Sequence, residues 1–416
     1  MDPPETAMKA GKLFSMLAEL GRVSDERGRL TRTFLSPAMR RANALVGGWM
    51  KEAGLVVRED AVGNLIGRVE GADPKAKTLL LGSHLDTVRD AGRFDGPLGV
   101  LLPIMALGEL KRRGIALPFS VEVIGFSEEE GVRFASAYLG SEGYTGRLKA
   151  RTLALRDDAG VSVREVLKKF GGGKFSLPKP AHRRGDLLGY VEVHIEQGPV
   201  LEKAKLAVGV VSAIAGQSRF KLTWTGQAGH AGTTPMDLRR DALAGAAEFV
   251  TGVEMIARRT PGLVATVGAL TVAPGAANVI PGEVVHTLDV RHARDAVRRA
   301  ALMQLGRLAT CIARERGLRR RWQRTQENRA VACSPSLTAQ LARSVQAVQG
   351  RSLSLVSGAG HDGVVMAALT PVAMLFVRCR EGLSHHPDEH ASPGDLGVAL
   401  RVMVDFLQRM AQQDAQ

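Results

Sequence analysis

The sequence predicts an α/β protein of two domains, one of which is inserted into the other. The chain has 416 residues, more than a single hydrophobic core usually supports. Its first half and its last quarter alternate between helical and strand patterns, as expected of a layered α/β domain. Between about Val208 and Arg329 the order changes to strand, helix, two strands and helix, which is typical of a small α+β sandwich. We therefore expect a main domain of residues 1–211 and 332–416 and an inserted domain of residues 212–331.

Start and stop signals indicate the elements of the main domain. Ser36-Pro37 begins a helix that ends near Gly54, because serine caps a helix N-terminus, proline fits the first turn and glycine commonly follows the end. Another helix is expected at residues 98–113, and Pro103 should kink this helix or displace its start. Apolar runs indicate strands at residues 62–69, 78–82, 119–126, 188–195 and 372–377, and a last helix is expected at residues 396–410.

The inserted domain has its own series of elements. An alternating strand at residues 219–225 indicates a sheet with one exposed face. A helix is expected from near Leu238 to Arg258. Strands should follow at residues 263–272 and 283–291, and then a second helix at residues 293–316.

Composition limits the classes of function. The net charge is +14 and residues 314–324 are the densest basic segment, but only 4% of residues are aromatic and no nucleic-acid-binding module is visible. The longest apolar run, near residues 100–107, is too short to span a membrane, and the N-terminal residues do not follow a secretory signal pattern. Three widely spaced cysteines fit neither a disulfide framework nor a thiolate zinc site. We expect a soluble cytoplasmic protein with no nucleic-acid or membrane partner.

Histidines and carboxylates follow two of the predicted strands in the first half. His84 and Asp86 end the strand that starts at residue 78, and alternation points both side chains to the same side. One of them can then bind a metal ion while the other orients it. Residues 128–130 are three adjacent glutamates after the strand at 119–126. They would repel one another unless a cation neutralised them, so this pattern favours a metal site.

Further clusters extend this candidate site. His194 closes the strand at 188–195, and the loop at 382–390 contains His385 and His386. One ligand from each cluster gives five candidates: His84, Asp95, a glutamate of the triplet, His194, and either His385 or His386. Mixed nitrogen and oxygen donors suit zinc, with manganese or cobalt as alternatives.

Five ligands exceed the needs of one tetrahedral site. We therefore expect two divalent metal ions, roughly 3.5–4 Å apart, that share one carboxylate, with Asp95 as the bridge. Water held between two ions becomes a hydroxide near neutral pH, and a neighbouring carboxylate that is not a ligand can collect its proton.

Several short motifs occur in order along nearly the whole chain. They are Gly82-Ser-His-Leu-Asp-Thr-Val, Phe94-Asp-Gly, Glu129-Glu-Gly-x-Arg-Phe, His194-Ile-Glu-Gln-Gly-Pro, Gly229-His-Ala-Gly-Thr-Thr-Pro-Met, Asn278-Val-Ile-Pro-Gly, Ser357-Gly-Ala-Gly-His-Asp and Ser384-His-x-Pro-Asp-Glu. Together they resemble the metal-dependent amidohydrolases that include N-carbamoyl-L-amino-acid hydrolase, allantoate amidohydrolase and β-ureidopropionase, relatives of aminoacylases and di-zinc carboxypeptidases. The resemblance implies a di-zinc exopeptidase-like catalytic domain with an inserted α+β sandwich that serves as a lid and as the contact of a homodimer.

The resemblance also implies roles for individual residues of the catalytic domain. Two groups of three would each hold one ion: His84, Asp95 and His194, and Asp95, Glu130 and His385. Glu129 would be the general base, and Asp86 would fix the orientation of His84. His386 would replace His385 if the register of that loop shifted by one residue.

In the inserted domain the resemblance implies contacts with the reacting substrate. His230 would stabilise the tetrahedral oxyanion in the site of the partner subunit. Three residues would bind the substrate's amide and carboxylate: Gln217, Asn278 and Arg291. Simpler alternatives exist, because His230 could be a surface residue, Asn278 a turn former, and Arg291 the ion-pair partner of Asp289 or Asp295.

The leading hypothesis is hydrolysis of a C–N bond in a ureido or N-carbamoyl amino acid, of the allantoate amidohydrolase or N-carbamoyl-L-amino-acid hydrolase type. A metal-bound hydroxide would attack, with Glu129 as the base. The alternative keeps the metal site but cleaves an N-acyl amino acid or a dipeptide, and a third hypothesis is a metal-binding protein without catalysis. Departures from the family pattern at Ala91, Gly363 and Arg378-Cys379 affect no expected ligand, but they leave the substrate within this class open.

Overall fold

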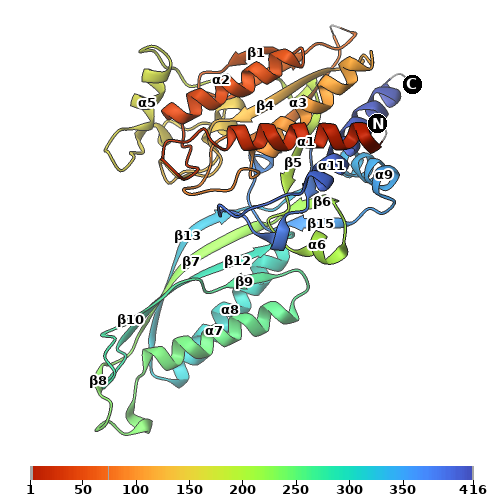
Figure 1. Cartoon of the computed structure of the whole chain (residues 1–416). Coiled ribbons are helices and arrows are strands. Elements are labelled where there is room, and N and C mark those ends of the chain that lie inside the picture. Colours follow the sequence, from red (N-terminus) through yellow and green to blue (C-terminus); the bar gives the residue numbers. More distant parts are fainter. Residues whose placement is uncertain (1–2, 74, 415–416) are drawn as a thin grey trace. The chain divides into compact units, whose positions relative to one another are not determined.

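The computed structural model describes residues 3–73 and 75–414, and the chain divides into two compact units (Figure 1). Unit 1 comprises residues up to 212, residues 333–355 and residues from 359 onward. Unit 2 comprises residues 213–332 and 356–358, so its sequence interrupts that of unit 1. Helices and strands are mixed along the chain. The α/β class expected from the sequence is therefore confirmed.

The larger sheet has nine strands: β1 (Val56–Glu59), β2 (Leu65–Val69), β3 (Thr78–His84), β4 (Ser120–Phe126), β5 (Leu187–Ile195), β6 (Val208–Ile214), β14 (Val331–Ala332), β15 (Ser354–Ser357) and β16 (Val372–Val377). Their order is β1-β2-β4-β3-β5-β16-β6-β14, and β15 pairs with β6. The central strands β4, β3, β5 and β16 are parallel neighbours. β3 and β4 are buried along their whole length, as is usual for parallel strands that are covered on both faces.

The helices of unit 1 are α1 (Pro3–Leu20), α2 (Pro37–Glu52), α3 (Pro97–Arg112), α4 (Leu139–Tyr144), α5 (Val163–Phe170), α6 (Val200–Ala204), α9 (Pro335–Gln349), α10 (Gly363–Met366) and α11 (Pro393–Asp414). Short 3-10 turns lie at η1 (Thr152–Ala154), η2 (Arg184–Asp186) and η4 (Arg380–Gly382). The Ser36 hydroxyl caps α2 by accepting the Met39 N–H at 3.1 Å, as expected. Pro103 lies inside α3 without displacing the start of this helix from Pro97. Among the described residues, no helix combines the length and the apolar character that crossing a membrane requires.

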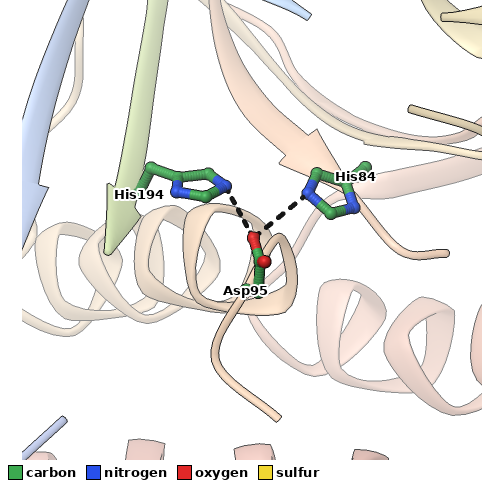
Figure 2. A group of neighbouring side chains, drawn as sticks. All are labelled: His84, Asp95 and His194. Atoms are coloured by element: carbon green, nitrogen blue, oxygen red, sulfur yellow. Dashed lines mark ion pairs between the residues drawn. The ribbon is translucent and has the colours of Figure 1, made fainter. Parts of the chain in front are cut away.

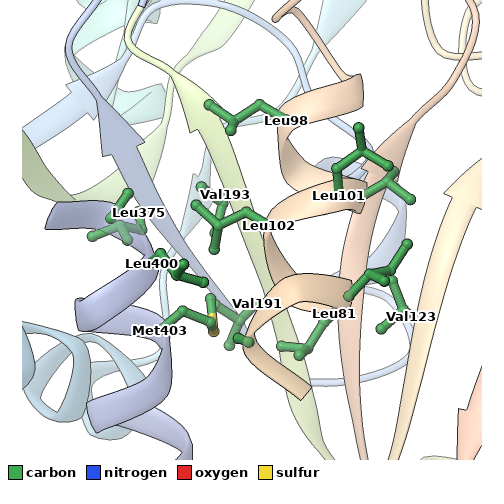
Figure 3. Packing of buried hydrophobic residues seen from close by; sticks show 14 of the residues in the cluster. Leu81, Leu98, Leu101, Leu102, Val123, Val191, Val193, Leu375, Leu400 and Met403 are labelled. Atoms are coloured by element: carbon green, nitrogen blue, oxygen red, sulfur yellow. The ribbon is translucent and has the colours of Figure 1, made fainter. Parts of the chain in front are cut away.

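The main core of unit 1 lies between the sheet and helices α3 and α11 (Figure 3). Leu98 and Leu102 of α3 face Val193 of β5, and all three side chains are buried. Full burial of such a side chain contributes about 1.5–3 kcal/mol. This packing fixes the start of α3 beside β5, and the loop that leads into α3 carries Asp95.

Unit 2 contains a five-stranded sheet of β7 (Gly216–Thr225), β9 (Val264–Thr266), β10 (Leu270–Ala273), β12 (Glu283–His292) and β13 (Arg319–Asn328). Helices α7 (Ala242–Arg259) and α8 (Asp295–Glu315) pack on this sheet around a core that includes Trp224, Phe249 and Leu305. A separate two-stranded sheet pairs β8 (Gly229–His230) with β11 (Val279–Ile280), and the 3-10 turn η3 (Met236–Leu238) follows β8.

Two expectations for unit 2 are wrong in detail, and one strand was not expected. Residues 263–272 form two strands, β9 and β10, instead of one, with Gly268 between them. The helix expected near Leu238 begins at Ala242, because the Asp241 side chain accepts the first free N–H groups and caps it. The basic segment that ends at residue 324 overlaps β13, which pairs antiparallel with β7. Most side chains of β13 are exposed, so no apolar alternation marked this strand.

Candidate metal centre

The candidate site lies where neighbouring parallel strands of unit 1 end. His84 is the last residue of β3, and His194 is the last but one of β5. The glutamates at 128–130 follow β4, the other neighbour of β3. The C-terminal ends of parallel strands meet at one edge of a sheet, which is where open α/β sheets collect their ligand sites.

One carboxylate oxygen of Asp95 lies between two histidine rings (Figure 2). It is 3.0 Å from His194 Nε2 and 3.6 Å from His84 Nε2, and all three residues are buried. His194 Nδ1 lies 2.9 Å from the Ile195 carbonyl, and His84 Nδ1 lies 3.0 Å from the Asp86 carbonyl. A proton on each Nδ1 satisfies these carbonyls and leaves both Nε2 lone pairs for a cation beside Asp95.

The other oxygen of Asp95 faces a second group. His385 Nε2 is 3.2 Å from Asp95 Oδ2 and 3.7 Å from Glu130 Oε1. His385 is half exposed, and its backbone is in the left-handed region with φ 57°. Four groups of described residues have ligand atoms close enough to hold an ion, and Asp95 belongs to two of them; His84, Glu129 and Glu130 form another. The neighbouring His386 instead faces Asp388 at 3.7 Å.

Asp86 connects this strand end to the glutamates after β4. Its carboxylate accepts the backbone N–H of Glu129 at 3.0 Å and that of Glu130 at 3.1 Å. The same carboxylate lies 3.4 Å from His84 Nδ1. Asp86 therefore fixes both the ring of His84 and the turn that presents the glutamates.

The pKa values of two acidic side chains of the site are raised. Burial raises the pKa of Glu129 well above its ordinary range. Burial and the nearby charge of Asp95 raise the pKa of Glu130 to about 7. Within the described part of the chain, the ion pairs of Asp95 and Glu130 are all with histidines. A set of carboxylates and imidazoles of this kind fits divalent zinc or manganese, whose charge would offset the repulsion.

The fourth group, Glu192, His194 and His361, was not expected as a unit. The ring centroids of His194 and His361 are 4.5 Å apart, and burial together with the charge of His194 lowers the pKa of His361 well below its usual range. Glu192 accepts the Ser83 hydroxyl at 2.8 Å. His194 Nε2 is directed at Asp95, so this fourth group does not provide a site independent of the first. The sequence signal for Glu192 was its charge inside an otherwise apolar strand.

Gln197 was also missed, although its motif was noted. Its amide Nε2 donates to Asp95 Oδ2 and to the Ser384 hydroxyl oxygen, both at 3.1 Å. Its Oε1 is buried and has no hydrogen-bond partner among the residues that the structure describes. Gln197 therefore presents an unused acceptor next to the Asp95 carboxylate.

In unit 2, Gln217 and Arg291 lie opposite each other on β7 and β12. Arg291 makes two hydrogen bonds of 3.0 and 2.9 Å to the Asp289 carboxylate and donates to the Gly358 carbonyl at 2.6 Å. Gln217 donates to the same carboxylate at 2.8 Å. Arg291 thus pairs with Asp289, as the simpler interpretation of Arg291 expected. It also lines a cavity of about 520 Å³ in unit 2, together with Arg219.

His230 lies on the separate two-stranded sheet, and Asn278 lies in the turn directly before its second strand, β11. The Ala231 N–H donates to the Asn278 carbonyl at 2.9 Å, and the Gly232 N–H donates to His230 Nδ1 at 3.1 Å. The His230 side chain is exposed. Within unit 2, Gln217 and Arg291 therefore lie on the five-stranded sheet, whereas His230 and Asn278 lie at the two-stranded sheet, Asn278 in the turn before it.

Comparisons with known proteins identify the family. Residues 80–409 match the family described as Peptidase family M20/M25/M40. The chain belongs to this family. The M20 chain is 42% identical to the N-carbamoyl-L-amino acid amidohydrolase of Geobacillus stearothermophilus, over 96% of this chain and 98% of the relative. It is 43% identical to the allantoate deiminase of Arabidopsis thaliana, over 94% of this chain and 81% of the relative.

Solved structures agree with this assignment of the M20 chain. An amidase of the hydantoinase/carbamoylase family from Burkholderia multivorans has a TM-score of 0.91 at 34% identity, covering 97% of this chain and 98% of that one. The resemblance to metal-dependent amidohydrolases that the motifs indicated is therefore confirmed.

Proposed function

We propose that the protein is a metal-dependent amidohydrolase that cleaves the C–N bond of a ureido or N-carbamoyl amino acid. The observation that carries this proposal is the Asp95 carboxylate, whose two oxygens face two separate groups of potential ligands. The names of the relatives, N-carbamoyl-L-amino acid amidohydrolase and allantoate deiminase, support the substrate class.

We propose that two divalent ions, zinc or manganese with cobalt as an option, bind to this site. His84, Asp95 and His194 would hold one ion, and Asp95, Glu130 and His385 the other. When bound, the ions would polarise the substrate carbonyl and acidify a water molecule between them. The donor types and the shared carboxylate support this assignment.

Glu129 is the proposed general base. It is buried beside Glu130, and burial raises its pKa; a carboxylate with a raised pKa is a stronger proton acceptor than an ordinary one. Glu129 takes a proton from the attacking water and delivers it to the leaving nitrogen, so that the C–N bond breaks and a carbamate is released with the amine. Asp86, through its hydrogen bonds to the backbone of Glu129 and Glu130, keeps the base in place.

Residues of unit 2 are proposed to bind the substrate and to complete the site. Arg291 has a planar guanidinium that can pair with the substrate carboxylate, and Gln217 and Asn278 would bind polar groups of the substrate. His230 would stabilise the oxyanion in the partner subunit of a homodimer. Exposed Met236 and Leu238, 76% and 70% accessible and close to His230 in sequence, support a protein contact on unit 2.

We also propose that the protein is cytoplasmic. All three cysteines are free: Cys311, Cys333 and Cys379. Free cysteines are usual in a reducing compartment.

Metal removal tests the proposed function. The protein is treated with a chelator, and zinc, manganese or cobalt is restored singly. Release of ammonia or amino acid is then measured from allantoate, N-carbamoyl-L-amino acids, N-carbamoyl-β-alanine and N-acetyl amino acids. Metal-dependent turnover of a ureido or carbamoyl compound is expected. Turnover of only the acetylated compounds would favour the aminoacylase-like alternative, and no turnover at all would favour a binding protein.

Glu129→Gln separates catalysis from metal binding. The substitution preserves size and removes the base, so we expect the metal content to persist while kcat falls by a factor of at least about 100. Metal content by elemental analysis and turnover are measured on the same sample. Unimpaired hydrolysis by this variant would rule out the assignment of Glu129 as the base.

A further inference from the structure

Glu389 lies at the end of the loop that carries His385, and its carboxylate is buried. One oxygen, Oε1, accepts the backbone N–H of Phe94 at 2.9 Å and that of Asp95 at 3.1 Å. The other oxygen, Oε2, lies 2.9 Å from the Ser384 hydroxyl. A single side chain thus connects the loop before α3 to a loop almost 300 residues further along the chain.

The backbone of the first loop passes directly over this carboxyl group. A Cβ atom added to Gly92 would lie 2.3 Å from Glu389 Cβ and 2.4 Å from its Oε1. The φ angle of Gly92 is not positive. Glycine is therefore needed here for the space that a side chain would fill and not for an unusual backbone conformation. The absent side chain lets the loop approach the carboxylate closely enough for the two N–H bonds.

The contacts continue from Glu389 to the side chain of Asp95. The Ser384 hydroxyl is 3.0 Å from Asp95 Oδ2, the oxygen that faces His385. Glu389 therefore contacts both partners of the Asp95–His385 pair or their neighbours. It accepts the backbone N–H of Asp95, and it contacts the hydroxyl of Ser384, the residue before His385.

The two groups that share Asp95 differ in how firmly the fold holds them. His84 and His194 are buried and belong to neighbouring strands of the sheet. His385 is 50% exposed and lies in a loop with a left-handed backbone. The second group therefore depends more than the first on contacts between loops.

We propose that Glu389 is a positioning residue that keeps Asp95 and His385 at the spacing required to hold the second metal ion, in the group Asp95, Glu130 and His385. This inference rests on the proposed function, because it assumes that the site binds two ions. Groups that orient metal ligands typically change metal affinity or activity by 10–100-fold when they are removed.

The test compares Glu389→Ala and Glu389→Gln with the wild-type protein. The amide oxygen of glutamine can still accept both backbone N–H groups, and its NH₂ can donate to Ser384, whereas alanine removes every contact. Each protein is loaded with zinc and titrated with a competing chelator, and the ions retained per chain are counted. For Glu389→Ala we expect one ion to be lost at a chelator concentration at least about tenfold lower than in wild type, while the other ion stays. Glu389→Gln should restore most of the affinity.

Glu109→Gln is the matched control. Glu109, on the last turn of α3, is another buried carboxylate of unit 1, and it pairs with Lys9 of α1 and with Arg113, which follows α3. Its loss should lower the unfolding temperature without changing either metal affinity. Cobalt substitution supplies a second readout, because the absorption spectrum of the more weakly bound ion should change in Glu389→Ala and not in Glu109→Gln.

The outcomes separate this inference from the proposed function. If wild type retains two ions and turns over a ureido compound, but Glu389→Ala holds both ions as tightly, the inference is wrong and the function stands. Equal weakening of both ions, or loss matched by Glu109→Gln, would also overturn it, because it would indicate a general structural effect. If wild type binds no ions, the proposed function itself fails.

Discussion

At the scale of single residues, the site depends on buried carboxylates whose charge must be offset. Asp95 and Glu130 face histidines, and Asp86 accepts backbone N–H groups. A buried carboxylate stabilises the fold only while it keeps such contacts, because an isolated buried charge destabilises the folded state. The fold therefore supplies a partner for each of these acids, and the two carboxylate oxygens of Asp95 face two different groups of potential ligands.

Glu122 on β4 offers a prediction on a buried acid away from this site. It accepts the Tyr144 hydroxyl at 2.8 Å and contacts His182 at 3.1 Å and Arg68 at 3.2 Å. Burial opposes its ionisation, but the hydrogen bonds and charges, led by that of His182, lower its pKa to about 2. Because the folded pKa is below the ordinary value of 4.5, this contribution to stability is complete above pH 4.5 and is lost as the pH falls towards 2.

Glu122→Gln should therefore be less stable than wild type at pH 6. Below pH 4.5 the difference in unfolding free energy should shrink by about 1.4 kcal/mol per pH unit. Urea unfolding of both proteins between pH 6 and pH 3 measures this trend. Two stability curves that stay parallel over this range would contradict it.

The residues that the sequence located and those that it missed differ in the range of their contacts. His84, His194 and the glutamates at 128–130 follow apolar strands directly, so local pattern was enough to indicate them. Gln197 and Glu389 acquire their positions through contacts with loops about 100 and 300 residues away. Both residues lie in motifs that the sequence shows, but the local pattern did not assign a role to either side chain.

At the scale of elements, the buried strands were predicted from the sequence more accurately than the exposed ones. The strands at 119–126, 188–195 and 372–377 were indicated within a residue or so of β4, β5 and β16, because buried parallel strands are continuous apolar runs. β13 and the edge strand β1 were not indicated, and both are mainly exposed. These strands form through backbone hydrogen bonds to a neighbouring strand, and such bonds cannot be inferred from the polarity of the side chains.

At the scale of the whole molecule, the interrupted sequence raises the question of why a second unit is present. Unit 1 alone contains both groups of potential ligands and the proposed base. Unit 2 contributes Arg291 and His230, whose proposed roles concern substrate carboxylate and oxyanion and not metal. On the proposed assignment, insertion separates two tasks: one unit would hold the metal ligands, and the other would bind the substrate.

The proposal that His230 acts in the site of the partner subunit can be tested on mixed dimers. Glu129→Gln and His230→Ala are each expected to be nearly inactive as homodimers. A mixed dimer contains one subunit with an intact Glu129 and one with an intact His230. If His230 acts in the partner's site, one of the two sites regains both groups, so the mixed dimer should show about half the wild-type activity per dimer.

The mixed dimer is obtained by co-expression with two different affinity tags, sequential purification and light scattering to verify its mass. Metal content is measured on the same sample, so that a lost ion is not mistaken for a lost base. A mixed dimer as inactive as its parents would show that His230 works within its own chain, and a His230→Ala homodimer that keeps wild-type activity would show that His230 has no role. A wild-type chain that remains monomeric at micromolar concentration would remove the basis for the transfer, since a symmetric partner is then absent and the exposed His230 has no second site to complete.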